Sequence, residues 1–212
     1  MKHCQAIVIL FALLSTAAFA QKKDEINFSD PYQIDSSEYF LIPRLVDNDN
    51  KEEYGKGKGY LPWGNYNEVF FYNSATKQTK KLFNGHLALI QPLTAQRYNY
   101  SDRREADTPR NILPNHIVWI ARTDDFNHDN GLDTEDPQYL FISSKTGDLK
   151  QVTPKGLNVV SWTLSKDKKM ILVKVQNDKN GNKKFGNGDD ELYYRIDLHA
   201  DISKIACYQV EM

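Results

Sequence analysis

Residues 125–136 read D-F-N-H-D-N-G-L-D-T-E-D, and residues 178–189 read D-K-N-G-N-K-K-F-G-N-G-D. Each stretch begins and ends with Asp, carries side-chain oxygens at its third and fifth positions, and has an apolar residue at its eighth. Ca²⁺ binds about six to eight oxygen atoms, and alternating oxygen side chains on a short loop bring such atoms to one point. The two stretches therefore predict two calcium-binding loops.

The first loop is the more acidic of the two. Without a cation, clustered carboxylates repel one another and raise each other's pKa. The second loop has fewer carboxylates and a Lys at its sixth position, so we expect it to bind more weakly. The alternative for both is an ordinary polar hairpin tip, because Asp and Asn are also common turn residues. The candidate metal ligands are Asp125, Asn127, Asp129, Asp133, Asp136, Asp178, Asn180, Asn182 and Asp189.

A longer repeat surrounds these loops. A shift of 53 residues, from 125 to 178, aligns 117–144 with 170–197 without a gap and places Val118 on Ile171. A weaker copy occurs near the start of the chain, where Lys51 opposes a cation. Each copy reads strand, acidic loop, strand, turn, strand, which predicts an antiparallel module used about three times. The predicted repeat units span about 38–84, 86–153 and 155–210.

The two loops resemble the calcium loops of EF-hand and dockerin proteins without the flanking helices. They depart from that pattern at the sixth position, where Asn130 and Lys183 stand in place of Gly. Asn adopts the left-handed backbone of a tight loop more readily than Lys does. The resemblance implies Ca²⁺ as a structural cofactor that holds each loop in place.

Residues 162–169, W-T-L-S-K-D-K-K, and the strand after them resemble the TolB-like β-propeller repeat, over about 155–200. Lys166 and Lys168 replace the usual Pro and Gly of that repeat. Three units are fewer than the roughly four to eight blades of a closed propeller. The resemblance therefore implies an all-β, antiparallel chain of about three blade-like repeats, as a partial propeller or an open stack of sheets.

The first residues predict export. A short polar start precedes the apolar run 6–14, and Ala18-Phe19-Ala20 stands before Gln21, which is typical of a secretory signal peptide spanning 1–20. We expect a periplasmic or secreted protein with a single all-β domain over 21–212. Cys207 is the only cysteine after the predicted cleavage site, so packing and bound metal must stabilise the domain without an internal disulfide.

Charge and motifs argue against several classes of protein. The chain has 27 Lys and Arg against 28 Asp and Glu, a balance that favours neither nucleic acid nor a membrane surface. No second apolar run is long enough to span a membrane, and no catalytic motif is recognisable. We therefore expect a protein that is not an enzyme.

The expected function is that of an exported calcium-binding β-repeat protein, serving as a binding or scaffold module for an unidentified protein or glycan. Two alternatives stay open. One is an inhibitor or immunity-type protein against a secreted toxin or hydrolase. The other is a carbohydrate-binding or carbohydrate-active protein, for which Tyr60 and Trp63 offer aromatic rings that can stack on a sugar. An unclosed sheet edge also favours association between copies of the chain.

Overall fold

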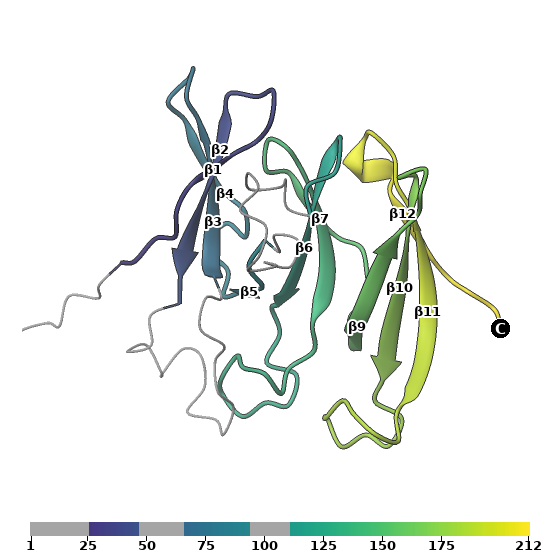
Figure 1. Cartoon of the computed structure of the whole chain (residues 1–212). Helices are drawn as coiled ribbons and strands as arrows, with labels where there is room; N and C mark the ends of the chain where they lie inside the picture. Colours follow the sequence, from purple (N-terminus) through teal and green to yellow (C-terminus); the bar gives the residue numbers. More distant parts are fainter. Residues whose placement is uncertain (1–25, 47–65, 94–110) are drawn as a thin grey trace, which may run out of the picture.

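The computed structural model describes residues 26–46, 66–93 and 111–212 (Figure 1). Its elements are β-strands apart from one short 3₁₀ turn, and the strand pairs are antiparallel, which confirms the predicted all-β antiparallel class. The elements are β1 (Tyr32–Gln33), β2 (Tyr39–Leu45), β3 (Tyr66–Asn73), β4 (Thr79–Lys81), β5 (Leu89–Ile90), β6 (His116–Arg122), β7 (Tyr139–Ser144), β8 (Leu149–Gln151), β9 (Leu157–Leu164), β10 (Met170–Asn177), β11 (Asp190–Asp197), η1 (Ile202–Lys204) and β12 (Ala206–Gln209).

The strands form three units of four, which lie side by side in Figure 1. Unit 1 (β1–β4) and unit 2 (β5–β8) belong to one sheet, because Tyr66 of β3 pairs with Ile90 of β5. Unit 3 is a separate sheet in the order β12-β11-β10-β9. Within the described ranges no strand pairing joins unit 3 to the other two, so the stack is open rather than closed.

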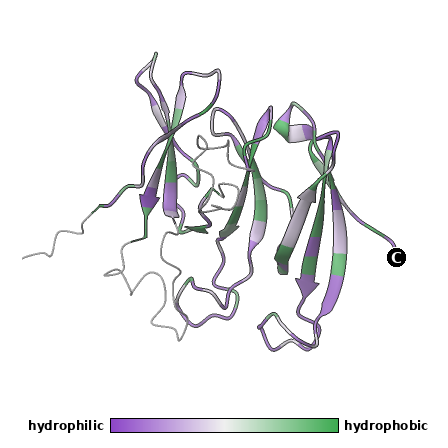
Figure 2. Cartoon of the chain, in the orientation of Figure 1, coloured by the Kyte–Doolittle hydropathy of each residue, from purple (hydrophilic) through white to green (hydrophobic). Residues whose placement is uncertain are grey.

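Unit 2 lies in the middle of the stack and is buried on both faces. Trp119 of β6 packs against Phe71 of β3 in the core between units 1 and 2, with the ring centroids 6.3 Å apart. Its neighbours Val118 and Ile120 pack with Val173 of β10 in the core between units 2 and 3. A strand covered on both faces is apolar along its length, and β6 is buried at every position except its last. Figure 2 shows hydrophobic residues along the strands of unit 2, with paler and hydrophilic segments among them.

The gapless alignment of the repeat is wrong by one residue at the strand before each loop. Val118 pairs with Ile142, whereas its counterpart Ile171 pairs with Ile196 and not with Arg195. In a strand that is apolar on both faces, hydrophobic alternation does not specify which residues take which face, and a slip of one residue exchanges the faces. As a result, Val118 points toward unit 3 while Ile171 points toward unit 2, into the same core.

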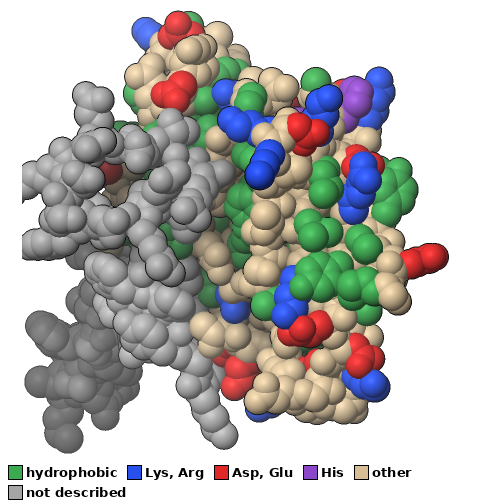
Figure 3. Space-filling model, turned by 45° about the vertical axis from the view of Figure 1, so that its right-hand side comes forward, with side chains coloured by type: hydrophobic (Ala, Val, Ile, Leu, Met, Phe, Trp, Pro, Cys, Tyr) green, Lys and Arg blue, Asp and Glu red, His purple; other side chains and the backbone are tan. Residues whose placement is uncertain are grey.

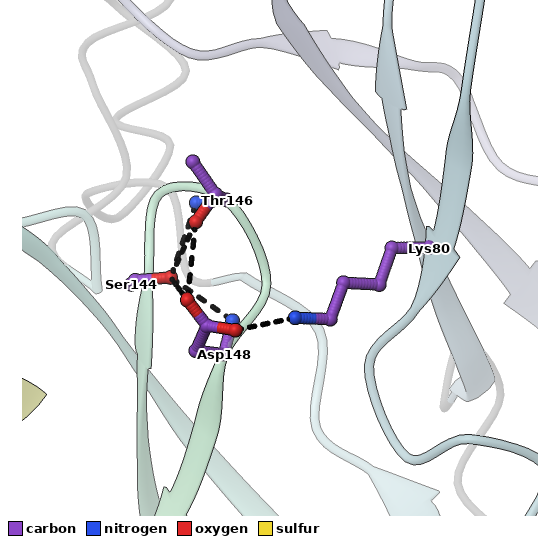
Figure 4. A network of polar contacts seen from close by, with 4 residues as sticks. All are labelled: Lys80, Ser144, Thr146 and Asp148. Carbon is purple, nitrogen blue, oxygen red and sulfur yellow. Dashed lines mark hydrogen bonds and ion pairs between the residues drawn. The ribbon is translucent and has the colours of Figure 1, made fainter. Parts of the chain in front are cut away.

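The turn between β7 and β8 joins unit 2 to unit 1 through side chains (Figure 4). Asp148 accepts a hydrogen bond from Lys80 of β4, with Nζ and Oδ1 2.5 Å apart, and its other oxygen accepts from the hydroxyls of Ser144 and Thr146. Gly147 has a φ of 87°, and a Cβ added there would lie 3.0 Å from a neighbouring Phe ring of unit 1. This close approach lets the turn pack directly against the neighbouring unit.

The final strand, β12, covers only the last part of the third repeat unit, Ala206–Gln209. The 3₁₀ turn η1 precedes β12, and Asp201 caps this turn by accepting a hydrogen bond from the backbone nitrogen of Ser203 at 3.0 Å. A short Asp side chain that bonds the nearby backbone favours a turn over a strand, which explains why the strand begins only at Ala206. Among the described residues, no helix has the length and apolar character needed to cross a membrane.

Candidate metal loops

The two acidic loops lie at the same end of the stack, between β6 and β7 in unit 2 and between β10 and β11 in unit 3 (Figure 1). All nine candidate ligands lie within the described residues, in these two loops. The weaker acidic copy at 47–58, the aromatic pair Tyr60 and Trp63, and the predicted signal peptide at 1–20 lie outside those residues. The structure therefore bears only on the loops at 125–136 and 178–189.

The opening Asp organises both loops in the same way. The carboxylate of Asp125 accepts hydrogen bonds from the backbone nitrogens of the fifth and sixth loop residues, at 3.2 and 3.0 Å. The carboxylate of Asp178 accepts from the equivalent nitrogens at 3.2 and 2.9 Å. These bonds bend the chain around the first side chain, so the two loops share their initial turn.

The oxygens at the third and fifth positions repeat as well. Asn127 and Asn180 each accept from the backbone nitrogen of the fifth residue, at 3.0 and 2.9 Å. Asp129 and Asn182 each accept from the backbone nitrogen of the seventh residue, at 3.1 and 2.8 Å. The alternating oxygen side chains therefore turn inward onto the loop backbone in both units.

The closing Asp ties the end of each loop to its beginning. Asp136 accepts from the backbone nitrogens of the second and ninth residues, at 2.8 and 2.9 Å. Asp189 accepts from the equivalent nitrogens at 3.3 and 2.8 Å. The two loops thus share a network of hydrogen bonds position by position, although few of their residues are identical.

The backbone also repeats. The fourth residue has a positive φ in both loops, 62° at His128 and 71° at Gly181. The sixth residue does too, with 70° at Asn130 and 60° at Lys183. The sixth position of this loop type therefore needs the left-handed conformation here as well, and a Lys adopts it at an energetic cost.

Burial distinguishes the first loop from the second. Asp133 and Asp136 are only 1% and 2% exposed, whereas Asp189 is half-buried. Burial, the main cause, raises the pKa of the Asp136 carboxyl, and the charges of Asp133 and Asp125 raise it further against the opposing hydrogen bonds. One oxygen of Asp133, Oδ2, is buried and has no hydrogen-bond partner among the residues that the structure describes. The first loop therefore holds more negative charge out of water than its own backbone neutralises.

Arg122 is a cation beside this loop that sequence reasoning missed. Its Nε donates to the backbone carbonyl of Asp136 at 2.9 Å, and its Nη2 donates to that of Thr134 at 3.4 Å. Burial lowers the pKa of Arg122, and the charges of Asp136 and Asp133 raise it. Its position at the end of a β-strand resembles that of an ordinary surface residue, so no sequence signal identified it.

The loop side chains do not form a compact acidic cluster, but their oxygens could still bind a metal ion. In the described part of the chain, no three Asp, Glu, His or Cys side chains are grouped so as to hold a metal ion. Loops of the EF-hand type also use amide and backbone carbonyl oxygens, which lie outside such a group. Each carboxylate oxygen has two lone pairs, so an oxygen that accepts one backbone hydrogen bond can still bind a cation.

Two tryptophans and Cys207 are parts of the core. Trp119 is buried and donates from Nε1 to Ser143 at 2.9 Å, and Trp162 packs against the core between units 2 and 3. Cys207 packs against the same core, and burial raises the pKa of its thiol to about 11. A thiol with that pKa stays protonated at neutral pH, which suits a packing role.

No protein-family model, no curated protein and no solved structure matches this chain.

Proposed function

We propose that the protein is an exported, non-enzymatic calcium-binding protein whose three β-units serve as a binding or scaffold module. Ca²⁺ would be structural. In the first loop it would be held by Asp125, Asn127, Asp129, Asp133 and Asp136, and in the second by Asp178, Asn180, Asn182 and Asp189. The proposal of export rests on the signal-like sequence of residues 1–20. The likeness of unit 3 to a TolB-like repeat remains part of this proposal.

The main support for calcium binding is the buried oxygen of Asp133 that has no partner among the described residues. A buried acceptor without a partner destabilises a fold by about 1–3 kcal/mol, and more when it is charged. Asp133 Oδ2 is such an atom, and it lies in a loop with three further candidate carboxylates. A divalent cation bound among these oxygens would offset both the missing contact and the mutual repulsion.

The repeated hydrogen-bond network gives independent support. Two loops with different residues at most positions keep the same inward direction of their oxygens at positions one, three, five and twelve. A hairpin tip that served only as a turn would not require all four. The second loop lacks a carboxylate at its ninth position, where Gly186 stands, so its proposed affinity is lower.

Asp133→Asn is the sharpest test of the proposal. Asn keeps one oxygen for the hydrogen bond that Oδ1 accepts from Glu135, and it removes the buried charge. In EDTA the variant should therefore melt at the same temperature as the wild type or higher. In millimolar Ca²⁺ the wild type should gain stability, by about 2.7 kcal/mol at a hundredfold excess over Kd, and the variant should gain less.

Asp167→Asn is the matched control, because Asp167 also accepts backbone and side-chain hydrogen bonds in a turn of unit 3 but lies outside both loops. Its response to Ca²⁺ should equal that of the wild type. Isothermal titration with Ca²⁺ would give the number of sites directly. An identical melting temperature in EDTA and Ca²⁺, with no heat of binding, would reduce both loops to polar hairpin tips.

A further inference from the structure

A cleft of about 440 Å³ opens between the two acidic loops. One wall is the end of the first loop, at residues 134–136, and the other is formed by Lys184 and Phe185 of the second. Its back is the edge strand β9, with Asn158 and Val160, together with Gln176 of β10. The volume falls within the range of about 300–1,000 Å³ that is usual for small-molecule sites.

Three side-chain amides converge on the cleft from three neighbouring segments, namely Gln138, Asn158 and Gln176. Asn158 Nδ2 contacts Gln176 Oε1 at 3.4 Å, and Gln176 Nε2 contacts the carbonyl of Gly186 at 3.4 Å. Both contacts are long for hydrogen bonds, so a ligand can displace them at little cost. Asn158 Oδ1 accepts a shorter hydrogen bond from the backbone nitrogen of Gln138 at 2.9 Å, and the Gln138 amide oxygen accepts from Arg122 at 2.8 and 2.9 Å. The groups left for a ligand are therefore the amide nitrogen of Asn158 and both ends of the Gln176 amide, which suit hydroxyl groups.

The charges that line the cleft balance. Arg122 and Lys184 stand against Glu135 and Asp136. Arg122 donates to carbonyls of the first loop, and Lys184 Nζ lies 3.7 Å from a carboxylate oxygen of Glu135. The lining therefore carries two positive and two negative side chains, which favours a neutral ligand over an ion. The recognition chemistry is that of a neutral, polar ligand.

Apolar surface completes the lining. Val160 is 47% exposed at the edge of β9, and the half-buried ring of Phe185 forms part of the opposite wall. A sugar ring presents hydroxyls at its rim and C–H groups on its faces, so it suits amides at the back of a cleft and an aromatic ring at its wall.

We propose that this cleft binds a neutral saccharide of one or two rings. The inference goes beyond calcium binding, because the lining residues that recognise the ligand are amides, Val160 and Phe185, and none of these is a candidate calcium ligand. It also places a glycan site at a different position in the chain from Tyr60 and Trp63.

The test is a titration of the ¹⁵N-labelled full chain with glucose, galactose, N-acetylglucosamine, maltose and cellobiose, in which amide chemical shifts are measured. At least one saccharide should shift amides at 134–136, 158–160 and 184–185. Citrate and putrescine serve as charged probes, and neither should do so. Each titration is run in Ca²⁺ and again in EDTA, so that a failure of calcium binding is seen separately from a failure of saccharide binding.

Gln176→Ala and Phe185→Ala should each weaken saccharide binding by at least about tenfold, since each removes a recognition contact. Gln209→Ala is the matched control, because Gln209 is an exposed Gln of unit 3 on β12, outside the cleft. It should bind as the wild type does. No shift with any saccharide, shifts confined to other residues, binding of a charged probe instead, or equal loss in Gln209→Ala would each overturn the proposal.

Discussion

The ring of Phe126 lies 5.4 Å from the ring of Phe185, with the two planes inclined by 40°. Phe126 is the second residue of the first acidic loop, and Phe185 is the eighth residue of the second. The eighth residue of the first loop, Leu132, is itself buried with Leu89 and packs against Val46, at the end of β2. The apolar residue at the eighth position of each loop therefore packs against residues of the preceding unit, Val46 in unit 1 for Leu132 and Phe126 in unit 2 for Phe185.

Phe185→Ala should lower the free energy of unfolding by about 1–3 kcal/mol. Fully buried Phe→Ala changes cost about 3–5 kcal/mol, and Phe185 is only half-buried. Equilibrium unfolding in urea measures the change. Tyr208→Ala, at a residue that is 56% exposed in the same unit, is the control and should change stability by much less. Equal effects at the two positions would mean that the contact with Phe126 contributes nothing to stability.

Lys168→Gly should stabilise the fold. Lys168 has a φ of 58° in the turn between β9 and β10, where its backbone nitrogen donates to the carbonyl of Ser165 at 2.9 Å. The left-handed conformation costs a non-glycine residue about 1–2 kcal/mol, and Gly removes this cost. Part of the gain is lost because Gly loses more conformational entropy on folding than Lys does. A net increase of roughly 0.5 kcal/mol is expected from urea unfolding. Lys166→Gly, two residues earlier and without a positive φ, should lower stability instead.

Asp148→Asn should weaken the join between units 1 and 2 in a pH-dependent way. The hydrogen bond from Lys80, the main cause, lowers the pKa of Asp148 below its usual 3.8. A depressed pKa in the folded state contributes stability above pH 3.8, and that stability is lost as the pH falls through the folded pKa. Because both side chains are about half exposed, the expected difference is only about 0.2–1 kcal/mol. A difference that does not shrink in acid would contradict the assignment.

Cys207→Ala should change how stability depends on pH in alkali. Burial raises the pKa of the thiol from 9.0 to about 11. The stability associated with the protonated thiol is complete below pH 9.0 and is lost as the pH rises to about 11, since only the unfolded chain ionises in that interval. The free energy of unfolding, measured in urea, should fall more steeply with pH across this interval for the wild type than for the variant. Parallel curves would show that the thiol is not buried in solution.

The outward face of unit 3 bears on the predicted association between copies. Figure 3 shows hydrophobic side chains on this side of the molecule, with Lys, Arg, Asp and Glu among them. Lys174 pairs with Glu191 at 2.6 Å and Arg195 with Asp197 at 2.6 Å, so these four charges are paired within the unit. Self-association therefore stays a prediction, which sedimentation of the purified chain would test.

Local patterns predicted most of the strands. The apolar runs that open the first repeat unit and the stretch aligned from residue 170 are observed as the strands Tyr39–Leu45 and Met170–Asn177. Short apolar runs between clusters of Asn, Asp and Gly carry this signal because strand and turn preferences are local. The positions of the two acidic loops followed from the same reasoning. Arg122 and the three amides of the cleft did not, since contacts between distant segments bring them together.

The sequence alone determined the antiparallel all-β class and the positions of the two loops, because each depends on residues close together in the chain. The tertiary structure decided which face of each strand is buried, as the offset between Val118 and Ile171 illustrates. It also decided that Asp133 is buried with an unpartnered oxygen and that Phe185 meets Phe126. Burial and contacts between units arise only when the sheets stack, and local sequence patterns do not specify how the sheets stack.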